Sequence, residues 1–289
     1  MTFNDDADIK GGRVSKRGRN AAIGAGGGGL ALILALVVSQ LLGVDVTGFV
    51  SDLGTSPDPG GTALSQCTTG SDANASVDCR MQAAATSLDA FWGDTLGSSY
   101  TQPELVLFDG RTDTGCGAAT TDVGPFYCPL DQTVYLDTAF YGELTTRFGA
   151  SGGTLAQLYV VAHEWGHHIQ TITGISDGLD LQTTGPASDS VRLELQADCF
   201  AGAWVGAAST TQDSEGHVFL QPVTSQQIGD ALSAASAVGD DRIQQTQTGQ
   251  VNPESFTHGT SAQRERWFTV GLQQGAQKCD TFGASAAGL

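Results

Sequence analysis

Basic side chains are scarce in this sequence. Its 289 residues include 13 Lys and Arg against 31 Asp and Glu, a formal net charge of -18 at pH 7. Residues 1–20 hold five of the bases, so the remainder keeps 8 bases and 28 acids, a net charge of -20. A surface this acidic repels nucleic acid, so nucleic-acid binding is excluded as a function.

The sequence also lacks any C-x-x-C pair, which argues against a structural zinc site. It has six cysteines, all of them after residue 60. An even count of this kind predicts disulfides formed in an oxidising compartment, although six cysteines allow 15 pairings. A buried free thiol at Cys199 stays open as the alternative. The expected pairs are Cys67–Cys79, Cys116–Cys128 and Cys199–Cys279.

Only one stretch of the chain is long, apolar and free of charge. Residues 21–44 reach the roughly 20 residues that a bilayer-spanning helix needs. Bases before this stretch and acids after it predict a single-pass anchor with a cytoplasmic N-terminus. A cleaved signal peptide fits less well, because no A-x-A site follows, and a buried core helix fits the preceding Gly run poorly. We therefore expect a plasma-membrane protein that contacts the lipid bilayer through residues 21–44.

The expected anchor divides the chain by composition. Residues 1–20 are predicted to be a basic cytoplasmic segment. Residues 45–75 are rich in Gly, Ser, Thr and Pro, which predicts a flexible tether. Residues 76–289 are then the folded domain, outside the cytoplasm.

Apolar periodicity within the domain predicts more helix than strand. Residues 240–256 fit neither pattern. The fold class is therefore α+β, helix-rich with a small antiparallel sheet. The expected helices cover residues 77–96, 155–172, 188–208, 225–238 and 262–274, and the expected strands cover residues 103–108, 124–128 and 133–136.

Residues 163–168 (HEWGHH) contain the motif HExxH within an expected helix. His163 and His167 lie about one turn apart, so both imidazoles can reach one metal ion. Glu164 is then placed beside a metal-bound water, where it can act as a general base. The motif predicts a zinc site with hydrolytic chemistry.

The motif does not continue as a metzincin would. Gln170 and Thr173 occupy the positions where HExxHxxGxxH requires Gly and a third His. A downstream Met-turn is also missing, because the two methionines are Met1 and Met81. The metzincin class is therefore excluded, and the third ligand must come from elsewhere.

Glu194 is the best candidate for that third ligand. It lies 27 residues after His167, on the next expected helix. Asp198 follows one turn later, where it can accept a hydrogen bond from a ligand histidine. A solvated helix face is the alternative, but neighbours such as Leu193 and Leu195 are too apolar for idle carboxylates.

The remaining histidines are assigned by their surroundings. His258, in a polar turn before the last helix, either stabilises an oxyanion catalytically or hydrogen-bonds the helix N-terminus. His168 points about 100° away from its neighbour around the helix, which favours a packing role. His217 lies in a polar loop and is expected to face solvent. An extended peptide could pair with a strand at residues 125–128 or 133–136.

Four motifs in order resemble the neutral zinc metallopeptidase family. These are HEWGHH, ELQADCFAG (residues 194–202), the strand pair GPFYCP…VYLD, and HGTSAQR (residues 258–264). Members of that family are similar in having a basic, Gly-rich N-terminus, one membrane segment and an exported catalytic domain. The resemblance implies a zincin-like fold with one Zn²⁺ on His163, His167 and Glu194, and Glu164 as base, as in gluzincins.

The sequence thus predicts a membrane-anchored zinc endopeptidase that cleaves a peptide or protein substrate outside the cytoplasm. Two alternatives stay open. One is an inactive envelope scaffold in which zinc only holds two helices together, and Glu164 argues against it because a structural site needs no such base. The other is a zinc hydrolase that acts on a non-peptidic substrate.

Overall fold

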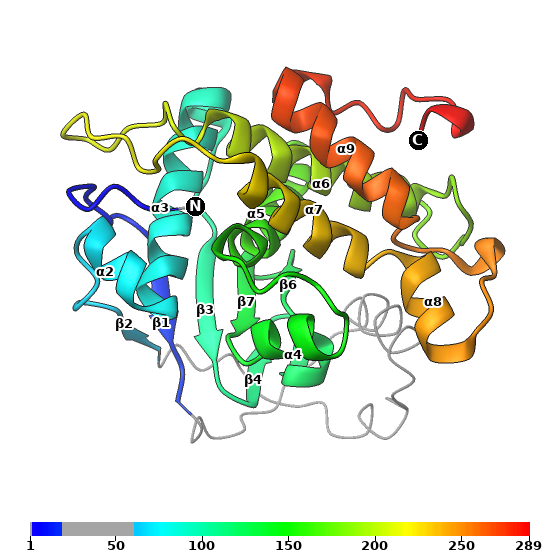
Figure 1. Ribbon diagram of the computed structural model, residues 1–289, viewed down its shortest axis with the longest axis horizontal. Coiled ribbons are helices and arrows are strands. Elements are labelled where there is room, and N and C mark those ends of the chain that lie inside the picture. The colour runs from blue at the N-terminus through cyan, green and yellow to red at the C-terminus, as the bar shows by residue number, and fades with distance from the viewer. Residues whose placement is uncertain (1, 19–60) are drawn as a thin grey trace.

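A computed structural model describes residues 2–18 and 61–289 of the protein, and Figure 1 shows their arrangement. The strands are β1 (Val14–Lys16), β2 (Thr62–Ala63), β3 (Glu104–Phe108), β4 (Arg111–Thr114), β5 (Gly117–Thr120), β6 (Phe126–Cys128) and β7 (Thr133–Asp137). The helices are α2 (Gly70–Ala75), α3 (Val77–Leu96), α4 (Phe140–Thr146), α5 (Thr154–Ile172), α6 (Asp189–Ala207), α7 (Ser225–Ala237), α8 (Asp240–Thr248) and α9 (Ser261–Gln274). Each of the helices predicted from periodicity is present, with ends that differ by at most one residue.

One five-stranded sheet organises the fold, in the order β2-β1-β3-β7-β6. β3 pairs in parallel with β1 and with β7, whereas β6 and β2 are antiparallel edge strands. The sheet is therefore mixed, and the expectation of an antiparallel sheet was wrong. One reason is that β1, which the sequence did not predict, pairs with the edge of β3. Another is that β4 and β5, which follow β3 in the sequence, form a separate hairpin, so that β7 pairs with β3 in parallel.

Helices cover one face of this sheet (Figure 1). α3 and α5 contact the strands, α6 and α7 pack against α5, and α9 packs against α6 and α7. Alternation along β3 explains the layering, because Leu105 and Leu107 join the main core while Val106 and Phe108 form a smaller cluster on the other face. α5 therefore lies at the centre of the molecule, between the sheet and the other helices.

Residues 2–18 belong to this folded unit. Phe3 and Ile9 are fully buried, and β1 pairs with β3 in the register Val14↔Leu105. Lys16 donates a 2.6 Å hydrogen bond to Asp78 of α3. The predicted separation of a cytoplasmic segment from the domain is corrected accordingly, because a strand of that segment completes the sheet.

Part of the predicted tether is also structured. Residues 61–75 contain β2 and α2, and the Cys67–Cys79 disulfide joins them to α3. The boundary at residue 76 was placed too late, because composition alone does not reveal a short helix clamped by a disulfide. Residues 45–60, the rest of that tether, lie outside the described residues.

The predicted fold class included a transmembrane helix, and this part of the prediction is corrected. Among residues 2–18 and 61–289, no helix has the length and apolar character needed to cross a membrane. What the structure supports is a mixed domain of helices and one small sheet. Residues 21–44, which were predicted to form the anchor, lie outside the described residues.

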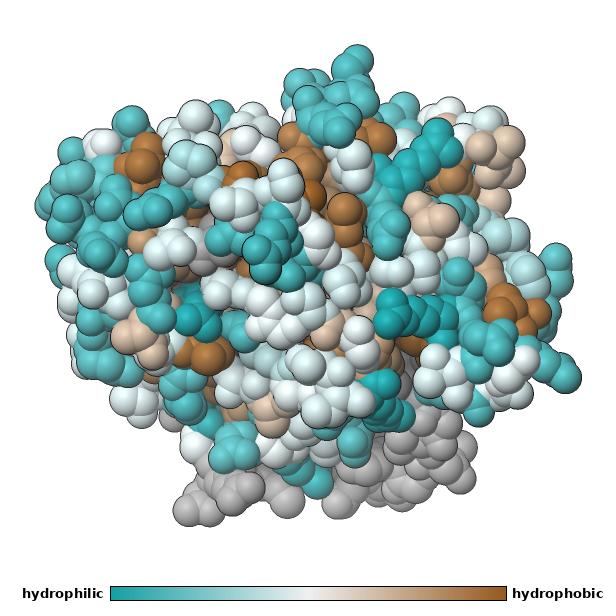
Figure 2. All heavy atoms as spheres, viewed as in Figure 1, coloured by the Kyte–Doolittle hydropathy of each residue, from teal (hydrophilic) through white to brown (hydrophobic). Residues whose placement is uncertain are grey.

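The three predicted disulfides are confirmed. Cys67–Cys79 and Cys116–Cys128 close short loops, and Cys199–Cys279 joins α6 to the segment after α9. Cys199 is therefore not a free thiol. On the face shown in Figure 2, hydrophilic side chains predominate and apolar ones are scattered.

Candidate metal centre

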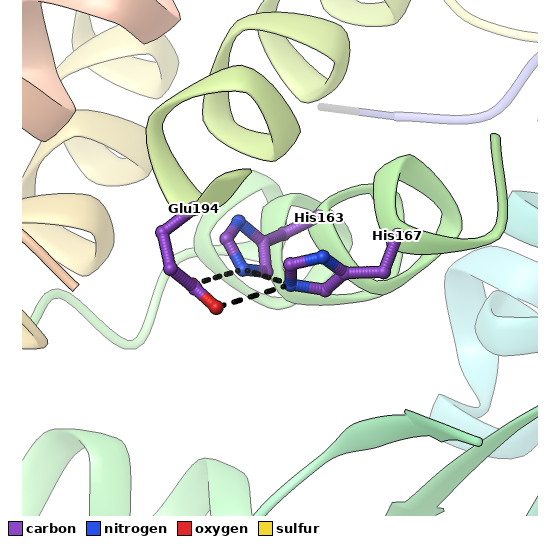
Figure 3. A group of neighbouring side chains, drawn as sticks. All are labelled: His163, His167 and Glu194. Atoms are coloured by element: carbon purple, nitrogen blue, oxygen red, sulfur yellow. Dashed lines mark hydrogen bonds and ion pairs between the residues drawn. The ribbon is translucent and has the colours of Figure 1, made fainter. Parts of the chain in front are cut away.

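Three side chains from two helices converge at the centre of the molecule. His163 and His167 project from α5 and Glu194 from α6, and all three point toward one another (Figure 3). His163 Nε2 lies 3.1 Å from Glu194 Oε2 and 3.2 Å from His167 Nε2. His167 Nε2 lies 3.4 Å from Glu194 Oε1. The predicted ligand residues are thus brought together.

A small residue lets the two helices approach this closely. Gly166 lies between the two histidines of α5 and faces α6. A Cβ at this position would lie 2.9 Å from Cα of Ala197, which is closer than real Cβ contacts allow. Gly166 therefore permits the backbone approach that carries Glu194 to the histidines.

The three donor atoms fit a tetrahedral metal ion. Zinc binds imidazole nitrogen and carboxylate oxygen at about 2.0–2.2 Å, so neighbouring ligands of a tetrahedral site lie roughly 3.3–3.6 Å apart. The observed separations of 3.1–3.4 Å are close to this range. Two imidazoles and one carboxylate also match the donor set of catalytic zinc sites, which leave a fourth position open.

A buried ion pair supports His163 from behind. Asp198 Oδ1 lies 2.8 Å from His163 Nδ1, as predicted for a hydrogen-bond acceptor behind a ligand. Nε and Nη2 of Arg264 on α9 donate to the two oxygens of the same carboxylate, at 2.8 and 2.9 Å. The hydroxyl of Tyr159, one turn before His163, also donates to Asp198. Asp198 is fully buried, and this arrangement orients the imidazole so that Nε2 faces the other ligands.

His167 is supported by an uncharged group. Its Nδ1 lies 2.9 Å from Oε1 of Gln170, one turn further along α5. Burial lowers the pKa of His167, so its imidazole is neutral near pH 7. A neutral imidazole is the form that binds a metal ion.

The electrostatics of the cluster favour a cation. Burial opposes ionisation of Glu194, but His167, His258 and His163 hold its pKa well below the usual range. Burial likewise opposes protonation of His163, yet Asp198 and Glu194 together raise its pKa to about 10. The two carboxylates therefore attract positive charge to this point, which either a proton or a metal ion can supply.

Glu164 lies in the same cavity as the three ligands. It is buried, and burial together with the charge of Glu194 raises its pKa to about 7 despite the opposing effect of His163. The backbone of Tyr127 in the edge strand β6 lies near enough to Glu164 to oppose this rise in pKa. A carboxylate that titrates near neutrality can both accept and return a proton.

His258 reaches the cavity from the turn before α9. Its Nδ1 lies 2.9 Å from Thr257 Oγ1 and 3.5 Å from Asp240 Oδ1. The other oxygen of Asp240, a fully buried residue, accepts the backbone NH groups of Thr257, His258 and Gly259 at 2.7–2.9 Å. Glu194 and Asp240 raise the pKa of His258 against the effect of burial. The turn is thus fixed with an imidazole at the cavity wall.

The last two histidines lie away from the cluster. His168 is fully buried and contacts the hydroxyl of Tyr127 at 3.1 Å and the carbonyl of Thr101 at 2.6 Å. The side chain of His217 is 43% exposed and lies 3.4 Å from Asp213. Both positions agree with the roles expected from the sequence.

The cluster opens into one cavity of about 270 Å³. Its lining includes all three ligand candidates, Glu164 and His258. The lining comes from elements far apart in the sequence, since α4 and β6 contribute residues to it as well as α5. Much of the wall is apolar, and its apolar side chains include Phe140, Phe148, Val160, Val238 and Ile243. A cavity of this type suits a ligand with a large apolar side chain beside a polar reacting group.

Sequence reasoning missed several residues that support the ligands. Tyr159 precedes His163 by four residues, which places both on one helix face, so its spacing was a usable signal. Arg264 lies within the HGTSAQR motif, but nothing in the motif names its partner. Gln170 follows His167 by three residues on the same helix, so its spacing was a usable signal too, whereas Asp240 carries none because its contacts depend on how α8 packs.

Comparisons with known proteins agree with this geometry. The family model described as "Putative neutral zinc metallopeptidase" matches residues 3–282, and the chain belongs to this family. The chain is 51% identical to the uncharacterized protein Rv2575 of Mycobacterium tuberculosis (strain H37Rv) over 256 residues, covering 86% of this chain and 87% of that protein. It is 40% identical to the uncharacterized protein YpfJ of Escherichia coli (strain K12) over 292 residues, covering 97% and 96%. No solved structure matches the chain.

Proposed function

We propose that this protein is a zinc-dependent endopeptidase. The observation that carries the proposal is Glu164, a buried carboxylate whose pKa of about 7 places its titration in the physiological range, in one cavity with His163, His167 and Glu194. A site that used zinc only to join two helices would need no such base. Family membership supports the same reaction class.

In this proposal one zinc ion is held by His163, His167 and Glu194. Zinc in such a site supplies a Lewis acid for the scissile carbonyl and lowers the pKa of water. Glu164 takes the proton from the attacking water and passes it to the leaving amine nitrogen. His258 donates from Nε2 to the carbonyl oxygen as that oxygen gains negative charge, because its Nδ1 is directed at Thr257 and Asp240.

The substrate in this proposal is an extended peptide. β6 is an edge strand, and its Tyr127 lines the same cavity as Glu164. A peptide that pairs with this edge would pass directly beside the base. The apolar wall beyond it accommodates apolar side chains of the substrate. The three disulfides support a location in an oxidising compartment outside the cytoplasm.

The test uses the full chain, zinc analysis and a peptide library. We expect about one zinc per chain and cleavage that a chelator abolishes. Glu164→Gln should keep zinc and lose roughly 10²- to 10⁴-fold in kcat, the usual contribution of a general base. Glu194→Ala should lose zinc itself.

Glu215→Gln is the matched control, because this glutamate is 66% exposed in a distant loop and should leave both readouts unchanged. Full zinc occupancy in Glu194→Ala would contradict the third ligand. A zinc-loaded chain that cleaves no peptide in the library would contradict the endopeptidase.

A further inference from the structure

A chain of amide groups runs from His167 to the C-terminal segment. His167 Nδ1 meets Oε1 of Gln170 at 2.9 Å, and Nε2 of Gln170 meets Oε1 of Gln196 on α6 at 3.1 Å. Nε2 of Gln196 then donates to the backbone carbonyl of Cys279 at 2.8 Å. Gln170 and Gln196 are both buried, so water does not replace these partners.

The last group of this chain sets the direction of every hydrogen bond in it. A backbone carbonyl can only accept, so the NH₂ group of Gln196 faces Cys279 and its oxygen faces Gln170. The NH₂ group of Gln170 must then face Gln196, and it also donates to the carbonyl of Leu193 at 2.7 Å. The oxygen of Gln170 is left to face His167. His167 therefore carries its proton on Nδ1 and presents the lone pair of Nε2.

The segment that carries the carbonyl of Cys279 is tied to α6 by several contacts, and two of them lie closest to that carbonyl in the sequence. The Cys199–Cys279 disulfide is one of them, and Cys199 is the neighbour of Asp198 in sequence. The second is Thr281, which donates to the carbonyl of Arg192 at 2.7 Å. The disulfide thus lies next to Asp198, the hydrogen-bond partner of His163, and also at the end of the hydrogen bonds that lead from His167.

We propose that Gln170 and Gln196 are positioning residues that fix the tautomer of His167. The hydrogen bonds that run from His167 through Gln170 and Gln196 to the carbonyl of Cys279 are called the relay below, and we propose that the Cys199–Cys279 disulfide anchors it. The relay makes zinc affinity depend on a covalent bond in the C-terminal segment. This inference rests on the proposed function in one respect, that His167 is a metal ligand.

Zinc affinity and the imidazole tautomer test the relay in the full-length protein. Gln170→Leu removes the acceptor for Nδ1–H, and we expect zinc affinity to fall 10- to 100-fold in competition with a chromogenic chelator. The ¹⁵N NMR spectrum of the metal-stripped variant should show His167 in two tautomers instead of one.

The other end of the relay gives a smaller effect. Gln196→Leu should weaken zinc binding about tenfold, near the lower end of the range for such support. Cys199→Ser with Cys279→Ser should weaken it less, because Thr281 still ties the segment to α6.

The matched controls are Gln82→Leu and Cys67→Ser with Cys79→Ser. Gln82 of α3 is also a buried glutamine, and it donates to the backbone carbonyls of Cys67 and Ile9 at 2.7 and 2.9 Å. These variants should lose stability without losing zinc affinity.

Zinc affinity within twofold of the parent in Gln170→Leu, with His167 in one tautomer, would overturn the relay. That result would leave the endopeptidase proposal standing. Conversely, a zinc-loaded parent that cleaves no peptide removes the proposed function and leaves the relay testable by its affinities.

Discussion

The two flanks of the metal centre orient their histidines by different chemistry. On the flank of His163, a carboxylate and a guanidinium form a fully buried ion pair. On the flank of His167, two neutral amides and a backbone carbonyl give the same orientation. Each flank leaves Nε2 free to face Glu194.

The difference is explained by the charge that Glu164 has to bear. Its pKa is already raised to about 7 by burial and by Glu194. A second unpaired carboxylate behind His167 would raise it further and keep the base protonated near neutrality. On the His163 flank, Arg264 neutralises Asp198, and on the other flank no charge is introduced. Both imidazoles are thus oriented without a further rise in the pKa of Glu164.

The largest effect is expected from breaking the charged flank. Arg264→Met leaves Asp198 buried without its cation, which costs about 3–5 kcal/mol in the free energy of unfolding. Urea denaturation monitored by circular dichroism measures this loss. Arg192→Met is the control, because Arg192 of α6 bonds only backbone carbonyls in the described contacts and should cost much less. Equal losses in the two variants would show that the ion pair has no special role.

Asp198→Asn tests the same flank without removing its volume. The amide can present NH₂ to His163 Nδ1 and so favour the wrong tautomer. Zinc affinity should fall 10- to 100-fold, about as much as in Gln170→Leu. If the flanks act independently, the double variant should lose the product of the two factors. A double variant no weaker than either single one would show that the flanks act as one unit.

A pH dependence of stability in metal-stripped protein tests the protonation of His163. His163 has a folded pKa of about 10, above its unfolded value of about 6.5, so its protonation stabilises the fold. That contribution is complete below about pH 6.5 and is lost as the pH rises toward 10. The free energy of unfolding should therefore fall between pH 7 and 9.5. Asp198→Asn should flatten the fall, and an identical slope in both proteins would contradict the assignment.

The sequence predicted the residues of the site better than their support. HExxH and the apolar setting of Glu194 are local patterns, and local spacing on a helix translates directly into geometry. Arg264 and Asp240 act across contacts between α6, α8 and α9 that no local pattern encodes. The same limit applies to the fold, since the periodic helices α5 and α6 were predicted, whereas β1, with three residues, was not.

The position of β1 in the sheet has a consequence for synthesis of the chain. Val14 pairs with Leu105, so the first strand to leave the ribosome waits for a partner about 90 residues later. At roughly 5–20 residues per second this delay lasts roughly 5–18 s. Until then β1 can pair only with the two-residue strand β2, and a chain without β1 would leave an edge of β3 open to pairing with other chains. β1 thus covers an edge of β3 that would otherwise be free to pair with another strand.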